Sequence, residues 1–142
     1  MTLESLAAAV LMAILLNLLF DLPHRTDLRA MGMVRRFVEM VVLAPFFETL
    51  LLQALPVGAV RIFDGGFRAQ LLAGWLMFAV AHLVNGLGSA LVAGLVGGFY
   101  LSFTYTHWRT QSFRSALWMT CSMHALYNLV LFATIAVLVP QP

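Results

Sequence analysis

A few polar side chains stand within otherwise apolar runs of this chain, and their types are those that catalyse hydrolysis. They are Glu48 in ETLLLQ, His82 in FAVAH, and His124 with Asn128 in HALYN. Ionisable groups in such runs are costly and usually have a functional role. A carboxylate can take a proton from water, and imidazole or amide N–H groups can stabilise the charge on a carbonyl oxygen. These residue types suffice for amide hydrolysis if the fold brings them together.

The same side chains permit two other chemistries. Glu48, His82 and His124 could hold zinc with water as the fourth ligand. The two histidines could also bind a haem iron axially, but haem leaves Glu48 and Asn128 without a role. Because an amide is a poor zinc ligand and a good oxyanion donor, Asn128 favours a metal-free site. We therefore predict no cofactor, with zinc as the alternative.

The composition indicates which solvent surrounds these residues. The chain is 62% hydrophobic and only 10% charged over 142 residues, which predicts an integral membrane protein. All its basic residues are arginines clustered between apolar runs, a pattern that suits lipid headgroups and argues against nucleic acid. The single cysteine, Cys121, excludes an internal disulfide and is expected to be an inert buried thiol.

The apolar runs predict an all-α transmembrane bundle with about five spans, in a single membrane domain covering 1–142. The expected spans are 3–20, 37–62, 69–86, 89–106 and 115–139. About 20 helical residues cross a bilayer core, so each run suffices. The first run lacks a positive leader region and carries Glu4, which favours a retained helix over a signal peptide. Pro45 and Pro56 predict a kink or a new helix start in the second.

Small residues form a stripe on the fourth span. Ala90, Gly94 and Gly98 follow one another at intervals of four residues. In a membrane, such a stripe lets a neighbouring helix approach closely. We expect this helix to be central to the packing of the bundle.

The rise of a helix gives the depth of each polar residue. The count starts from the arginines at one membrane face, namely Arg61, Arg68 and Arg114. From there Glu48, His82, His124 and Asn128 lie ten to fourteen residues inward. At about 1.5 Å per residue their depths are roughly 15–21 Å, which places polar groups of three helices in one layer. We expect a water-filled cavity to reach this layer from the face that bears the 21–36 loop.

Other polar residues have simpler explanations. Asn17 and Asn85 are predicted to lie at helix ends or to bond between helices. Glu39 follows Arg35 and Arg36 at helical spacing, so a surface ion pair is expected. Both remaining histidines, His24 and His107, are predicted to be solvated in loops.

The three motifs in this order resemble the CPBP intramembrane proteases, which include CAAX-processing endopeptidases and bacterial Abi proteins. That family's pattern reads E-E-x-x-x-R, F-x-x-x-H and H-x-x-x-N, and the resemblance covers a protease-like core at 37–132. It implies that Glu48 is the general base and that His82 positions the water. It also implies that His124 and Asn128 stabilise the oxyanion, while Phe78 opens the second motif.

The chain departs from the family pattern at two positions. Thr49 replaces the second glutamate and Gln53 replaces the arginine. Losing both charges together leaves neither one buried and unpaired, and the neutral residues could still share a hydrogen bond. These departures keep open a non-catalytic scaffold, immunity or regulatory role for the same fold.

The expected partners are the lipid bilayer and a peptide or membrane-protein substrate, with no nucleic acid. Arginine without lysine, in a chain rich in alanine, leucine and valine, favours a bacterial inner membrane.

Overall fold

The computed structural model describes residues 3–4, 7–8, 10–11 and 32–138. Regular structure within them is helical, which confirms the predicted all-α class. The expected first span at 3–20 and the loop at 21–36 lie largely outside the described residues, as do Asn17 and His24.

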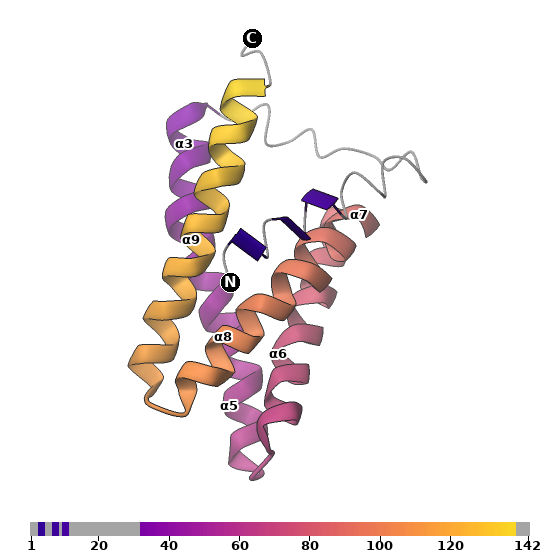
Figure 1. The fold of residues 1–142 in the computed structure, drawn as a ribbon, viewed down its shortest axis with the longest axis vertical. Coiled ribbons are helices and arrows are strands. Elements are labelled where there is room, and N and C mark those ends of the chain that lie inside the picture. Colours follow the sequence, from indigo (N-terminus) through magenta and orange to yellow (C-terminus); the bar gives the residue numbers. More distant parts are fainter. Residues whose placement is uncertain (1–2, 5–6, 9, 12–31, 139–142) are drawn as a thin grey trace.

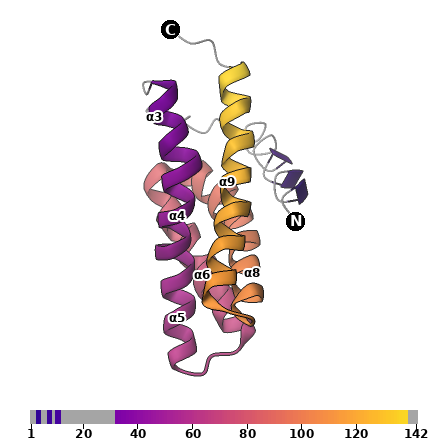
Figure 2. The same cartoon turned by 90° about the vertical axis from the view of Figure 1, so that its left-hand side faces the viewer.

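Four helical runs in the described residues are long and apolar enough to cross a bilayer. They are Met33–Ile62, Phe67–Asn85, Leu87–Arg109 and Phe113–Thr134, and they correspond to the second to fifth predicted spans. The last of them belongs to α9 (Phe113–Leu138). The 33–62 run and α9 lie side by side (Figures 1 and 2), and in the view of Figure 2 the other two runs lie largely behind them.

The 33–62 run alternates between two helix types. Its segments are α3 (Met33–Phe37), π-helical η1 (Val38–Leu43), α4 (Ala44–Glu48), π-helical η2 (Thr49–Ala54) and α5 (Leu55–Ile62). Each predicted break point, Pro45 or Pro56, stands at the start of an α segment directly after a π segment. A proline has no N–H to donate, and the wider π turn accommodates this loss locally. The prolines therefore change the helix type without breaking the helix.

The runs Phe67–Asn85 and Leu87–Arg109 are joined by a tight turn. This turn is at the membrane face to which the cavity is expected to open. Helix α6 (Phe67–His82) continues into 3-10 helix η3 (Leu83–Asn85). Gly86 turns the chain with φ +96°, a conformation that favours glycine. The next run then comprises α7 (Leu87–Ser89), π-helical η4 (Ala90–Gly97) and α8 (Gly98–Arg109).

The positions of Asn85 and His107 test two predictions about polar residues in these runs. Asn85 lies at a helix end, as expected. His107 was expected in a loop, and this prediction was wrong because α8 continues to Arg109. Its side chain is exposed and stacks on Phe103, one turn earlier in the same helix.

The small-residue stripe packs against α6 as predicted. Ala90, Gly94 and Gly98 are buried. A Cβ atom at Gly94 would stand 2.8 Å from Ala79 Cα and 3.3 Å from Ala79 O. Because backbone cannot move aside as a flexible side chain can, this position requires glycine.

Replacing Gly94 with leucine is expected to lower the thermal stability of the purified protein in detergent, because the larger side chain separates η4 from α6. Gly58→Leu is the matched control, since a Cβ atom at Gly58 meets no atom within 4 Å. Melting followed by circular dichroism measures both. Equal melting temperatures for the two variants would show that the Gly94 contact does not hold the bundle together.

Candidate active site

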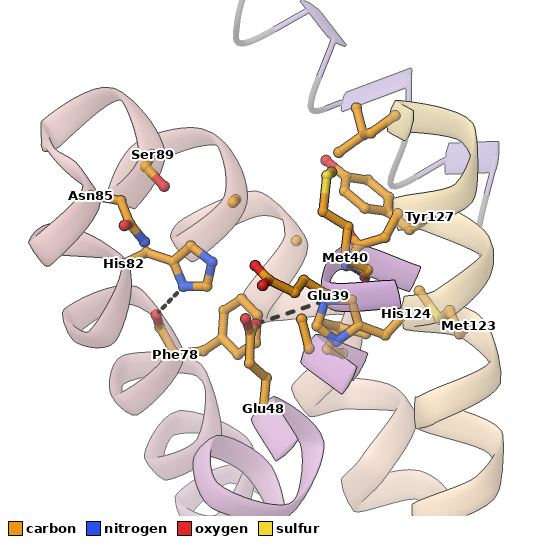
Figure 3. Close-up of a pocket in the computed structure, with 16 residues that line it drawn as sticks. Glu39, Met40, Glu48, Phe78, His82, Asn85, Ser89, Met123, His124 and Tyr127 are labelled. Atoms are coloured by element: carbon orange, nitrogen blue, oxygen red, sulfur yellow. Dashed lines mark hydrogen bonds and ion pairs between the residues drawn. The ribbon is translucent and has the colours of Figure 1, made fainter. Parts of the chain in front are cut away.

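One cavity of about 360 Å³ lies between the 33–62 run, α6, the η4–α8 helix and α9. All four residues expected to act in catalysis line it, and Figure 3 labels Glu48, His82 and His124 among them. Its polar lining consists of Glu39, Glu48, His82, Asn85, Ser89, His124, Tyr127 and Asn128. Asn85 is exposed at the connection between the second and third runs, so the cavity extends from the inner layer towards that membrane face.

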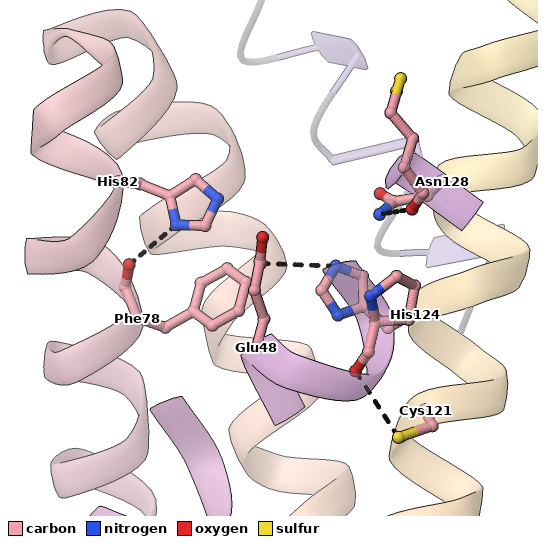
Figure 4. Close-up of polar contacts among 8 residues, drawn as sticks. Glu48, Phe78, His82, Cys121, His124 and Asn128 are labelled. Carbon is pink, nitrogen blue, oxygen red and sulfur yellow. Dashed lines mark hydrogen bonds and ion pairs between the residues drawn. The ribbon is translucent and has the colours of Figure 1, made fainter. Parts of the chain in front are cut away.

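Glu48 and His124 face each other across the cavity. Glu48 is the last residue of α4, and its Oε2 lies 3.8 Å from His124 Nε2 (Figure 4). The His124 side chain is 6% exposed and the Glu48 side chain 32% exposed. Water can therefore reach the carboxylate while the imidazole is held in a packed wall.

His82 stands at the C-terminal end of α6 with one ring nitrogen engaged. Its Nδ1 lies 3.0 Å from the carbonyl oxygen of Phe78, one turn earlier. A carbonyl only accepts hydrogen bonds, so Nδ1 carries the proton and Nε2 becomes an acceptor. This tautomer suits a residue that holds water by accepting one of its hydrogens.

Phe78 contacts both histidines of the site. Its ring stacks on His82 with centroids 4.4 Å apart and meets the His124 ring edge-on at 5.8 Å. The side chain is buried, and a Cβ atom at Gly98 would stand 3.0 Å from its Cδ1. Phe78 therefore orients the two imidazoles, and the close approach of α8 keeps its ring in place.

Asn128 bonds to the backbone of the neighbouring helix. Its Nδ2 donates to the carbonyl oxygen of Met40 at 2.8 Å. Met40 lies in η1, five residues before Pro45, which has no N–H to complete a π-type bond to that carbonyl. The amide thus satisfies an acceptor that the proline leaves open, and its second N–H remains for another partner.

Thr49 directly follows Glu48 and Gln53 comes five residues after it, and both are fully buried. Gln53 Oε1 accepts a hydrogen bond from Ser102 Oγ of α8 at 2.7 Å. The partner of the glutamine is therefore a serine of another helix, and not Thr49 as the spacing suggested. A Cβ atom at Gly74 would approach the same glutamine oxygen to 2.5 Å, so this contact is tightly enclosed.

Ser102→Ala is expected to destabilise the protein by about 1–3 kcal/mol, because it leaves the buried Gln53 oxygen without its donor. Ser122→Ala on the exposed face of α9 is the control and should change stability little. Chemical unfolding in detergent provides the measurement. A change for Ser102→Ala no larger than that of the control would mean that the bond adds nothing to the fold.

Sequence reasoning did not place Glu39 in the cavity. Glu39 forms the predicted surface pair, with Arg35 Nε donating to its Oε1 at 2.7 Å. It also lines the cavity that contains Glu48. The available signal was Pro45, which follows Glu39 by six residues and marks a change in helical register between the two glutamates.

Cys121 is buried, as predicted. Its Sγ lies 3.5 Å from the carbonyl oxygen of Pro45, outside the lining of the cavity.

The proposed zinc ligands do not fit a metal in their present arrangement. Among the described residues, no three His, Cys, Asp or Glu side chains converge closely enough to hold an ion. The contact of His82 Nδ1 with the Phe78 carbonyl does not itself oppose a metal at Nε2, since metal-bound histidines commonly make such a bond.

Comparison of this sequence with known proteins identifies its family. Searches against curated proteins and against solved structures gave no match. The family model described as type II CAAX prenyl endopeptidase Rce1-like matches residues 29–130. This range holds all three motifs and covers well over half of the chain. The protein therefore belongs to the Rce1-like family of type II CAAX prenyl endopeptidases, within the CAAX-protease group that its motifs resemble.

Proposed function

We propose that this protein is a glutamate-type intramembrane endopeptidase that cleaves a peptide or membrane-protein substrate in the bilayer. The observation that carries the proposal is the cavity in which Glu48, His82, His124 and Asn128 come together between apolar helices. Family membership supports an endopeptidase. A bacterial inner membrane is the proposed location, on the basis of composition.

The reaction follows from the placement of these groups. Glu48 takes a proton from water, and the water oxygen attacks the scissile carbonyl carbon. His82 holds this water through Nε2. The carbonyl oxygen becomes an oxyanion that accepts hydrogen bonds from His124 and from the free N–H of Asn128. As the carbon–nitrogen bond breaks, Glu48 returns the proton to the leaving amine, so a carboxyl and an amine are formed.

The test is a cleavage screen with the full chain in liposomes. Internally quenched peptides and single-span membrane proteins serve as substrates, and mass spectrometry identifies the products. Cleavage that resists chelation, with no bound metal found by elemental analysis, supports the glutamate mechanism. Loss of cleavage that zinc restores would instead favour a metalloprotease.

Asn128→Ala is expected to lower kcat by roughly 10²-fold and to leave measurable activity, because His124 still donates to the oxyanion. Asn128→Asp should be no better, since a carboxylate cannot donate and repels the Met40 carbonyl. Initial rates at saturating substrate measure both variants. Wild-type activity in Asn128→Ala would remove this residue from the oxyanion site.

A further inference from the structure

Glu39 and Glu48 line the same cavity although regular helical geometry would separate them. The two residues are nine positions apart, which corresponds to about 2.5 turns of α-helix. In a regular helix their side chains would point in opposite directions. In the structure both belong to the cavity lining, and the Glu39 side chain reaches into it (Figure 3).

The π-helical segment η1 explains this placement. A π segment takes up an extra residue, which rotates the preceding chain by about 100° relative to the following helix. Pro45 ends η1 on one side, and Asn128 holds the Met40 carbonyl within it. Specific contacts therefore maintain the register that brings Glu39 round to the cavity.

The lining of the cavity is negatively charged. Among the described residues that line it, the charged side chains are Glu39 and Glu48, and no arginine is included. Arg35 reaches Glu39 from outside, with side chains 71% and 38% exposed. Exposed pairs of this kind are weak, and Arg35 uses only Oε1 of the carboxylate. The second oxygen can accept from a cationic donor that enters the cavity.

We propose that Glu39 is a specificity-determining residue that binds a cationic side chain of the substrate, a lysine or an arginine. The inference rests on the proposed endopeptidase function and names a substrate class for the same cavity. In the proposed reaction Glu48 acts at the scissile bond, and Glu39 is the second carboxylate of the cavity, which can bind a substrate side chain. Acidic side chains at the same substrate position are repelled.

The separation of Glu39 and Glu48 along the helix axis indicates where the recognised lysine or arginine lies in the substrate. Nine residues of helix rise about 13 Å, which equals roughly four residues of extended peptide. A lysine or arginine side chain adds its own reach. We therefore expect the recognised residue two to four positions from the scissile bond.

The experiment compares three series of quenched peptides that differ at one position. Starting from a sequence that the wild-type protein cleaves, lysine, glutamine or glutamate is placed in turn two, three and four residues from the scissile bond on each side. The values of kcat/KM are measured for the full chain in neutral phosphatidylcholine liposomes. At one position we expect lysine to exceed glutamate at least tenfold, with glutamine between them.

Charge-changing variants then test whether Glu39 is responsible. Glu39→Gln should reduce the lysine-to-glutamate ratio to below about threefold, and Glu39→Arg should invert it. Arg35→Gln should preserve or increase the ratio because a competing cation is removed. Asp64→Asn, at the exposed turn after α5, is the matched loss of a carboxylate and should leave the ratio unchanged. Added salt should lower the wild-type ratio.

The outcomes separate this inference from the proposed function. Cleavage of the lysine, glutamine and glutamate peptides at equal rates, or a ratio that survives Glu39→Gln, would overturn the role of Glu39 alone. If the wild-type protein cleaves no peptide or membrane protein, the endopeptidase function fails and the inference fails with it.

Discussion

Glu48→Gln is expected to abolish peptide cleavage while the protein still accumulates in the membrane. Glutamine has nearly the same shape as glutamate, but its amide cannot take a proton from water. General base catalysis contributes roughly 10² to 10⁴ in rate, so the remaining cleavage should be close to the background. Product formation by mass spectrometry and the amount of folded protein in detergent extracts are measured together.

This variant also separates catalysis from a scaffold or regulatory role. A carboxylate that only holds the bundle together would, on replacement, reduce the amount of folded protein. Glu48 is partly exposed to a cavity, and glutamine keeps polar atoms beside His124, so Glu48→Gln should leave the amount of folded protein unchanged. Cleavage that persists in Glu48→Gln and in Glu48→Ala would refute the mechanism, because no other group of the cavity is assigned to activate water.

His124→Ala is expected to lower kcat by at least 10²- to 10³-fold, the cost of losing an oxyanion donor. The effect should exceed that of Asn128→Ala, because His124 lines the cavity and its Nε2 also lies 3.8 Å from Glu48 Oε2. The loss should appear in kcat more than in KM, since the developing negative charge exists only in the transition state.

His107→Ala provides the control for removing an imidazole. His107 is exposed near the end of α8 and does not line the cavity. This variant should cleave at the wild-type rate. Equal losses in the two histidine variants would indicate a general effect on folding, and wild-type kcat in His124→Ala would exclude it from the site.

Next to Glu48, the neutral residues Thr49 and Gln53 stand where the resembled family pattern has a glutamate and an arginine. Gln53 is fully buried, and its Oε1 accepts a hydrogen bond from Ser102 of α8 at 2.7 Å. A neutral bond of this kind avoids the desolvation cost of two buried charges. It also ties the helix that carries Glu48 to α8 and so supports the position of Glu48.

Much of the architecture could be predicted from the sequence. Four of the predicted spans correspond to helical runs, and Gly94 meets the backbone of α6 as its small size suggested. The common depth of Glu48, His82 and His124 could also be predicted, and all three line one cavity. These results depend on apolar length and on helical rise, which are local properties of the chain.

The sequence could not predict the side on which each group would point, nor its partner. A regular helix would have turned Glu39 away from Glu48, and the π segment before Pro45 brings both to the cavity. Asn128 binds the Met40 carbonyl, and Gln53 binds Ser102. Helical rise fixes how deep a residue lies, whereas its rotation and its partners depend on packing between helices far apart in the sequence. The sequence therefore determined the layer of the site, and the tertiary structure decided which groups meet within it.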